Sequence, residues 1–291
     1  MHDPRLDTLA DLLIKHSTRL EQGEKILIET FDIPEDMVIA LIRAARKVGG
    51  VPLVSCKQNR IQRELIQAGQ EEAMQTIGEC ETYRMERVQA YIGLRGSRNV
   101  AELSDVSAAA MELYERHWVQ PVHFQVRVPK TKWVVLRWPS ASMAQQAKMS
   151  TDAFEDFYFN VCTLNYSKMA DAQKPLAALL EQTDKVHITG PGTDLRFSIK
   201  NIPAIPCSGE HNIPDGECFT APVRDSVAGT IRFNTPTLYR GTPFEDISLR
   251  FENGRIVEAT ASDTDALNDI LDADNGARFI GEFAIGFNPF I

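Results

Sequence analysis

Short apolar runs alternate with helical patterns through the first half of the chain, and this alternation restricts the fold more than any other feature. Apolar residues spaced three and four apart lie between the runs, and Gly49 and Gly50 end one such helical segment. Four runs have the length and composition of buried strands, at residues 25–29, 51–55, 90–94 and 132–136. Strand followed by helix is typical of a doubly wound α/β layer with a mainly parallel sheet.

Pro52 lies in the second of these runs. Proline has no N–H to donate to a neighbouring strand, so it is tolerated at the first residues of a strand or on an edge strand. We therefore expect residues 51–55 to begin a strand or to lie at the edge of the sheet.

Doubly wound folds often bind nucleotides, but the sequence contains neither G-x-G-x-x-G nor a P-loop. Nucleotide binding therefore rests on fold analogy alone, and a shift of the melting temperature by ATP or NAD would test it. Residues 93–97, Gly-Leu-Arg-Gly-Ser, end a predicted strand. This segment could face a ligand or simply reverse the chain, and loop statistics favour the turn.

The sequence pattern changes after Lys185. Predicted strands joined by short turns, which are typical of antiparallel sheets, replace the alternation of strands and helices. Two helices over residues 151–182 are interpreted as a bridge between domains. Strands at 186–189 and 195–199 flank a glycine-rich loop, and Asn253-Gly254 is a strong hairpin signal between 247–251 and 255–259. Ser262 and Asp265 predict a capping box for a helix through Leu271, and residues 278–287 are expected to return as a strand.

The predicted fold class is α/β. An N-terminal doubly wound α/β domain (residues 1–185) precedes an incomplete α+β domain rich in antiparallel strands (residues 186–291).

The composition excludes some classes of protein. With 31 Lys and Arg against 40 Asp and Glu, the net charge is -9, whereas a nucleic-acid binder needs a basic face. The N-terminus lacks the pattern of a signal peptide, and no apolar run approaches the roughly 20 residues of a membrane span. Five scattered cysteines without a C-x-x-C pair indicate a reducing compartment. We expect a soluble, cytoplasmic protein with neither nucleic acid nor membrane as partner.

Residues 207–222 combine potential metal ligands with a restricted backbone. The segment includes Asp215 and Glu217, three prolines close by, and two glycines. Oxygen ligands must meet a divalent cation at about 2.0–2.2 Å, so a loop that aims carboxylates at one point would have this composition. An acidic surface turn explains the same residues, since Asp-Gly is a common turn pair, and composition alone favours the turn.

Glu282 is the second candidate, because it interrupts the apolar segment 279–285. Glutamate is rarely buried unless it is paired or binds a metal. In a regular strand it would share a face with Ile280 and Ala284. A buried metal ligand and an exposed strand residue are equally supported by this pattern.

Taken in order, three motifs resemble one family of metallo-aminopeptidases, which includes aminopeptidase T and aminopeptidase S. They are residues 190–195, residues 212–222, and Gly281-Glu282 with Asn288-Pro289 after it. The resemblance is weak over residues 1–185 and strong over 186–291. Its motifs are specific in combination.

The resemblance implies a cytoplasmic, homodimeric exopeptidase that removes N-terminal amino acids from a peptide substrate. It implies two divalent metal ions (zinc, cobalt or magnesium), with Glu217 and Glu282 matching the family's two carboxylate ligands. Such a pair of cations can polarise the scissile carbonyl and lower the pKa of a bridging water. The family's remaining ligands, histidines and an aspartate, lie in a segment beyond Ile291. His211 is interpreted as a loop residue or a neighbour of the substrate, and no residue is assigned as general base.

Two interpretations of the chain's end remain open, a fragment of a complete enzyme or a natural short form, and the apolar Phe290-Ile291 favours the fragment. The alternative function is a non-catalytic dimerising or peptide-binding module that lacks a complete metal site.

Overall fold

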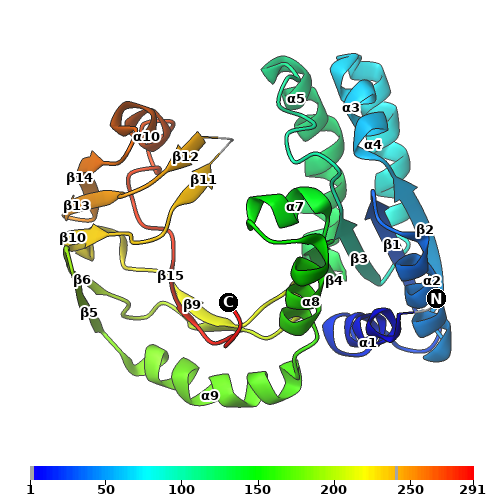
Figure 1. The fold of residues 1–291 in the computed structure, drawn as a ribbon, viewed down its shortest axis with the longest axis horizontal. Helices are drawn as coiled ribbons and strands as arrows, with labels where there is room; N and C mark the ends of the chain where they lie inside the picture. Colours follow the sequence, from blue (N-terminus) through cyan, green and yellow to red (C-terminus); the bar gives the residue numbers. More distant parts are fainter. Residues whose placement is uncertain (1–2, 240–241) are drawn as a thin grey trace. The chain divides into compact units, whose positions relative to one another are not determined.

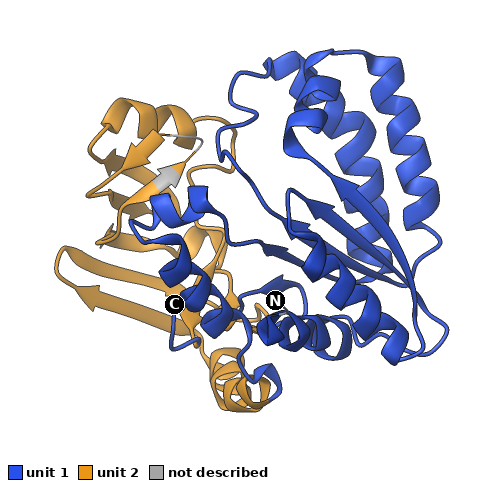
Figure 2. Ribbon diagram, turned by 45° about the vertical axis from the view of Figure 1, so that its right-hand side comes forward, with its two compact units in different colours: residues 1–167, 208–215, 288–291 blue, residues 168–207, 216–287 orange. Residues whose placement is uncertain are grey.

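The computed structural model describes residues 3–239 and 242–291. The chain forms two compact units that interleave along the sequence (Figure 2). Unit 1 contains residues 1–167, 208–215 and 288–291, and unit 2 contains residues 168–207 and 216–287. The domain boundary near residue 185 stays a prediction of the sequence.

Unit 1 is built on a five-stranded parallel sheet (Figure 1). The strand order is β2 (Val51–Lys57), β1 (Lys25–Phe31), β3 (Ala90–Arg95), β4 (Lys132–Arg137) and β8 (Asn212–Ile213). The four strands predicted from the first half of the sequence are confirmed. β2 is an edge strand, which accommodates Pro52.

Helices cover both faces of this sheet, as a doubly wound fold requires. α1 (Pro4–Leu12), the π-helix η1 (Leu13–Ser17) and α2 (Glu35–Lys47) pack on one face. On the other, α4 (Glu71–Met85) and the π-helix η2 (Glu115–Arg127) enclose an apolar cluster with Leu27 and Tyr91. The remaining helices of this unit are α3 (Asn59–Gln67), α5 (Ala108–Tyr114), α6 (Val128–Lys130), α7 (Ala141–Gln146) and α8 (Thr151–Cys162).

The sequence of α2 explains why it forms and which side it buries. Glu35 and Asp36 lie in the first turn and Arg46 and Lys47 in the last, so both ends complement the helix dipole. The apolar side chains at helical spacing are buried, including Met37, Val38, Leu41 and Ala45.

Unit 2 contains the antiparallel strands expected from the second half. One sheet has the order β14 (Arg255–Thr260), β13 (Ser248–Glu252), β10 (Ala228–Arg232), β6 (Thr193–Ser198) and β5 (Lys185–Gly190). A second has the order β15 (Phe283–Gly286), β9 (Glu217–Thr220) and β7 (Ile205–Cys207). The other elements are α9 (Tyr166–Gln182), which continues from unit 1, the 3₁₀ turn η3 (Arg224–Ser226), β11 (Thr237–Tyr239), β12 (Thr242–Phe244) and α10 (Thr264–Leu271).

The hairpin predicted at Asn253-Gly254 is present between β13 and β14. Asn253 has φ 49° and Gly254 has φ 80°, the left-handed backbone that a tight hairpin turn requires. A Cβ atom on Gly254 would lie 1.8 Å from the carbonyl oxygen of Arg224, so glycine is needed there.

Two local expectations in unit 2 were wrong in detail. The cap of α10 is Asp263, whose Oδ1 accepts a hydrogen bond from Ala266 N at 3.0 Å, rather than a box formed by Ser262 and Asp265. Of the strand expected over residues 278–287, only Phe283–Gly286 forms β15, while Phe279 makes an isolated bridge with Arg255.

The fold class is therefore confirmed as α/β with antiparallel sheets in the second half. Among the described residues, no helix is both long enough and apolar enough to cross a membrane.

Candidate metal centre

In unit 1, residues 208–215 form a loop that is held by hydrogen bonds within it and by bonds to Tyr166 and Asn288. Asp215 Oδ2 accepts from Gly209 N at 2.7 Å, and Asp215 N donates to Tyr166 Oη at 3.2 Å. The backbone oxygen of Asp215 accepts from Asn288 Nδ2 at 2.9 Å. The ring of His211 lies 4.5 Å from that of Trp133, between centroids. These contacts make the loop a defined structure, and His211 packs as a loop residue.

Glu217, in unit 2, is the first residue of β9 and is half-buried. Its backbone oxygen accepts a hydrogen bond from Gln173 Nε2 at 3.1 Å, and the same nitrogen donates to the oxygen of Cys207 at 2.9 Å. Gln173 lies on α9 and is fully buried. One amide group thus joins β7, β9 and α9, and fixes the backbone from which the Glu217 side chain projects.

Gln173 was not among the predicted site residues, although the sequence carries a signal for it. Gln173 shares a helical face with the core residues Leu176, Ala177 and Leu180, at spacings of three, four and seven. A polar side chain on the apolar face of a helix needs a hydrogen-bond partner within the protein.

Glu282 lies in unit 2, directly before β15, and its side chain is exposed. The next residue, Phe283, points into the core, where its ring lies 5.1 Å from that of Phe197. Because adjacent residues alternate between the faces of a strand, the inward position of Phe283 directs Glu282 outward. Glu282 is therefore exposed in this structure, and its role as a metal ligand stays a prediction.

The pairing of β9 with β15 relates the two glutamates. Glu217 is opposite Gly286, and Phe283 is opposite Thr220, in an antiparallel register. Glu282 is four residues from Gly286, which corresponds to roughly 13 Å of strand at ~3.3 Å per residue. Glu217 and Glu282 therefore lie near opposite ends of one strand pair.

The described residues do not by themselves complete a metal site. No group of three or more His, Cys, Asp or Glu side chains within residues 3–239 and 242–291 could hold a metal ion. A catalytic zinc usually has three protein ligands. We therefore assign no reaction step to a metal bound by these residues.

Unit 1 is a doubly wound α/β layer, and unit 2 is an antiparallel unit that carries Glu217 and Glu282. Comparison with protein families identifies the class of protein that has these features. The chain matches the family model described as Thermophilic metalloprotease (M29) over residues 2–289, and it belongs to this family. The family resemblance inferred from the sequence motifs is confirmed.

Individual relatives are bacterial aminopeptidases. The chain is 23% identical to aminopeptidase AmpS of Bacillus subtilis over 321 residues, which covers 97% of this chain and 76% of AmpS. It is 38% identical to aminopeptidase T of Thermus thermophilus over 110 residues, 34% of this chain and 27% of the relative. The solved structure of wild-type AmpT from Thermus thermophilus superposes with a TM-score of 0.79 at 24% identity, covering 97% of this chain and 78% of that one. At this identity the structural match shows a shared fold. The family and the aminopeptidase relatives confirm the prediction that the chain is a metallo-aminopeptidase, a hydrolase.

Proposed function

We propose that this metal-dependent aminopeptidase releases N-terminal amino acids from peptides through a two-metal site, to which Glu217 and Glu282 contribute carboxylate ligands. The family match over residues 2–289 carries this proposal. The names of the relatives, aminopeptidase AmpS and aminopeptidase T, support the choice of an exopeptidase. We further propose zinc, cobalt or magnesium as the metal, a homodimer as the assembly, and the cytoplasm as the location.

Both glutamates would bind the cations through their carboxylate oxygens, but their surroundings differ. Glu217 projects from a backbone fixed by the buried Gln173, whereas Glu282 is exposed and adjacent to a core residue. Divalent cations bind carboxylate oxygens readily, and two negative charges would offset part of the charge of two cations. Further ligands are needed, because two carboxylates are too few for two catalytic metals.

Hydrolysis of aminoacyl-p-nitroanilides by the full-length protein, with added zinc, cobalt or magnesium, tests the activity. Glu217→Gln and Glu282→Gln are expected to lower the rate by about 100-fold or more, because even residues that only support metal ligands contribute about 10–100-fold. Metal content per chain, measured after dialysis, should fall with the rate. The matched control is Glu258→Gln, an exposed carboxylate on β14.

The ligand assignment would be overturned if both variants kept wild-type activity and metal content. The molar mass measured by light scattering tests the homodimer separately. The mass of a monomer would refute the proposed dimer and leave the proposed activity untouched.

The second candidate function is a non-catalytic dimerising or peptide-binding module. The absence of a group of three metal-ligating side chains among the described residues favours it. It predicts a stable oligomer with no turnover and no saturable zinc binding by isothermal titration calorimetry.

A further inference from the structure

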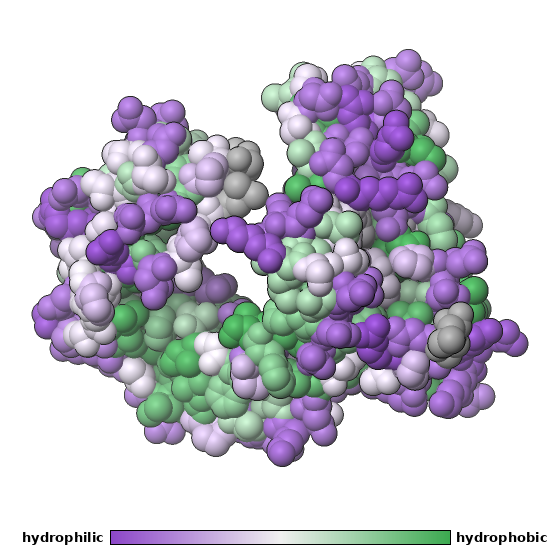
Figure 3. All heavy atoms as spheres, viewed as in Figure 1, coloured by the Kyte–Doolittle hydropathy of each residue, from purple (hydrophilic) through white to green (hydrophobic). Residues whose placement is uncertain are grey.

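A cavity of about 480 Å³ opens in unit 1 at the carboxyl ends of the parallel strands. Lys57, Arg95 and Arg137 line it from the ends of β2, β3 and β4, and η2 contributes Trp118 and Arg127. Doubly wound sheets bind their ligands at this edge. The surface over the neighbouring helices α3 and α5 is mostly hydrophilic (Figure 3). The volume is within the range of small-molecule sites.

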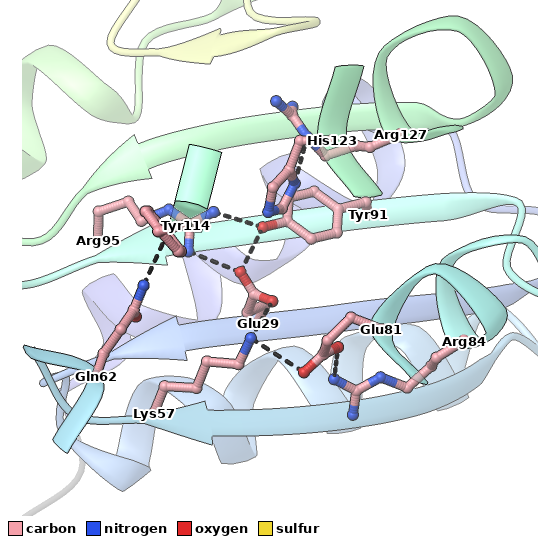
Figure 4. A network of polar contacts seen from close by, with 10 residues as sticks. All are labelled: Glu29, Lys57, Gln62, Glu81, Arg84, Tyr91, Arg95, Tyr114, His123 and Arg127. Carbon is pink, nitrogen blue, oxygen red and sulfur yellow. Dashed lines mark hydrogen bonds and ion pairs between the residues drawn. The ribbon is translucent and has the colours of Figure 1, made fainter. Parts of the chain in front are cut away.

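The floor of this cavity is a buried ionic network centred on Glu29 (Figure 4). Glu29 is 2% exposed, and its carboxylate accepts from Arg95 Nη1 at 2.8 Å, Lys57 Nζ at 3.0 Å and Tyr91 Oη at 3.0 Å. Burial alone would raise the pKa of Glu29, but the charges of Arg95 and Lys57 outweigh it and hold the pKa far below its ordinary value. The carboxylate is therefore ionised and fully occupied by its own partners.

The cavity contains more cationic groups than Glu29 can neutralise. Arg95 and Arg137 are register partners on adjacent parallel strands, so two like charges lie side by side. Arg137 is exposed and has no acidic partner among the described residues. Glu102 and Glu115 also line the cavity, and neither forms an ion pair with these arginines in the described part of the chain. A bound anion would relieve this repulsion.

Arg127 provides a donor that the protein leaves unused. Its Nε donates to His123 Nδ1 at 3.1 Å, while its Nη1 is buried without a hydrogen-bond partner. Its guanidinium lies over the rings of Trp133, at 4.3 Å, and Tyr91, at 5.3 Å, and makes no ion pair with a described carboxylate. A buried donor without a partner costs about 1–3 kcal/mol.

His123 adds a neutral donor. Burial, aided by the nearby charges of Arg95 and Arg127, lowers the pKa of His123 to about 4. Because Nδ1 accepts from Arg127, the proton of the neutral ring is on Nε2. The ring lines the cavity, where this N–H is available to an acceptor.

We propose that this cavity binds a small organic acid, with its carboxylate held by Arg127, Arg137 and His123 and its apolar body against Trp118, Val119 and Phe124. The planar forks of arginine match a carboxylate in a bidentate manner. The apolar side chains favour an organic acid over an inorganic ion. The segment Gly93–Ser97, for which loop statistics favoured a simple turn, contributes Arg95, Gly96 and Ser97 to this cavity.

Isothermal titration calorimetry on the full chain, at constant ionic strength, tests the site with phenylacetate as the probe. We expect saturable 1:1 binding, and binding about tenfold or more weaker for phenylacetamide, which has the same shape without the charge. Arg137→Gln, an exposed position that does not endanger folding, and Arg127→Lys should each weaken phenylacetate binding by about tenfold or more. Arg98→Gln is the matched control, because Arg98 lies near the same sheet edge but does not line this cavity.

Three outcomes would overturn the proposal: no saturable heat with phenylacetate, equal affinity for phenylacetamide, or unchanged affinity in both arginine variants. A titration with inorganic phosphate distinguishes the kind of anion, and binding of phosphate without phenylacetate would refute the organic acid. None of these measurements depends on peptidase activity, so failure here is separable from failure of the proposed function.

Discussion

Gln173 Nε2 donates a hydrogen bond to the backbone oxygen of Glu217 at 3.1 Å, although 44 residues separate the two along the chain. The same nitrogen binds the backbone oxygen of Cys207. One buried amide therefore sets the position of the strand from which a proposed metal ligand projects, which makes Gln173 a positioning residue.

Replacing Gln173 with leucine should lower the free energy of unfolding by about 1–3 kcal/mol, because the backbone oxygens of Cys207 and Glu217 lose a buried donor. Urea denaturation followed by circular dichroism measures this change. Gln182→Leu, an exposed position on the same helix, is the control. Equal midpoints for the two variants would show that the amide has no such role.

Glu29→Gln should lower the free energy of unfolding by about 3–5 kcal/mol, because Arg95 loses its buried carboxylate and Lys57 keeps only Glu81, at 3.2 Å. The control Glu64→Gln removes a carboxylate that pairs with Arg63 at 2.6 Å but is 74% exposed. That change should cost less than about 1 kcal/mol. A similar loss in both variants, measured by urea denaturation, would contradict the importance of the buried network.

The pH dependence of stability should contain a contribution from His123. Its pKa falls from 6.5 to about 4 on folding, chiefly through burial, so below pH 6.5 the unfolded chain binds more protons than the folded one. The stabilisation is present above pH 6.5 and is lost as the pH falls toward 4. His123→Asn should flatten the stability curve between these values. An unchanged slope in His123→Asn would refute the assignment.

Gly93→Ala should destabilise unit 1 by about 1–3 kcal/mol through overpacking. A Cβ atom there would lie 2.8 Å from Tyr91 Oη and 2.9 Å from its Cε1, and the buried Tyr91 ring has no room to move. Gly190→Ala is the matched control, since nothing lies within 4 Å of its Cβ position. The melting temperatures of the two variants provide the comparison, and a Gly93→Ala protein as stable as the control would disprove the steric argument.

The sequence predicted the main elements of both units because their signals are local. Periodic apolar residues defined the strands and α2, Pro52 indicated an edge strand, and Asn253-Gly254 located a hairpin. The motifs at residues 190–195, at residues 212–222, and at Gly281-Glu282 with Asn288-Pro289 identified the family in combination. In each case neighbouring residues carry the information, through backbone preferences and the alternation of buried and exposed positions.

Only the tertiary structure decided which distant residues meet. The short strand β8 joins the parallel sheet beside β4, although 75 positions separate Asn212 from Arg137, the last residue of β4. Glu282 interrupts an apolar pattern yet is exposed, because Phe283 takes the inward position. The sequence places Glu29 at the end of a predicted apolar strand. Its carboxylate is ionised because Arg95 and Lys57, on the two neighbouring strands, donate hydrogen bonds to it. Local patterns fix which residues are strands and helices, but hydrogen bonds and charges between distant segments depend on strand order and register, which no short stretch of sequence encodes.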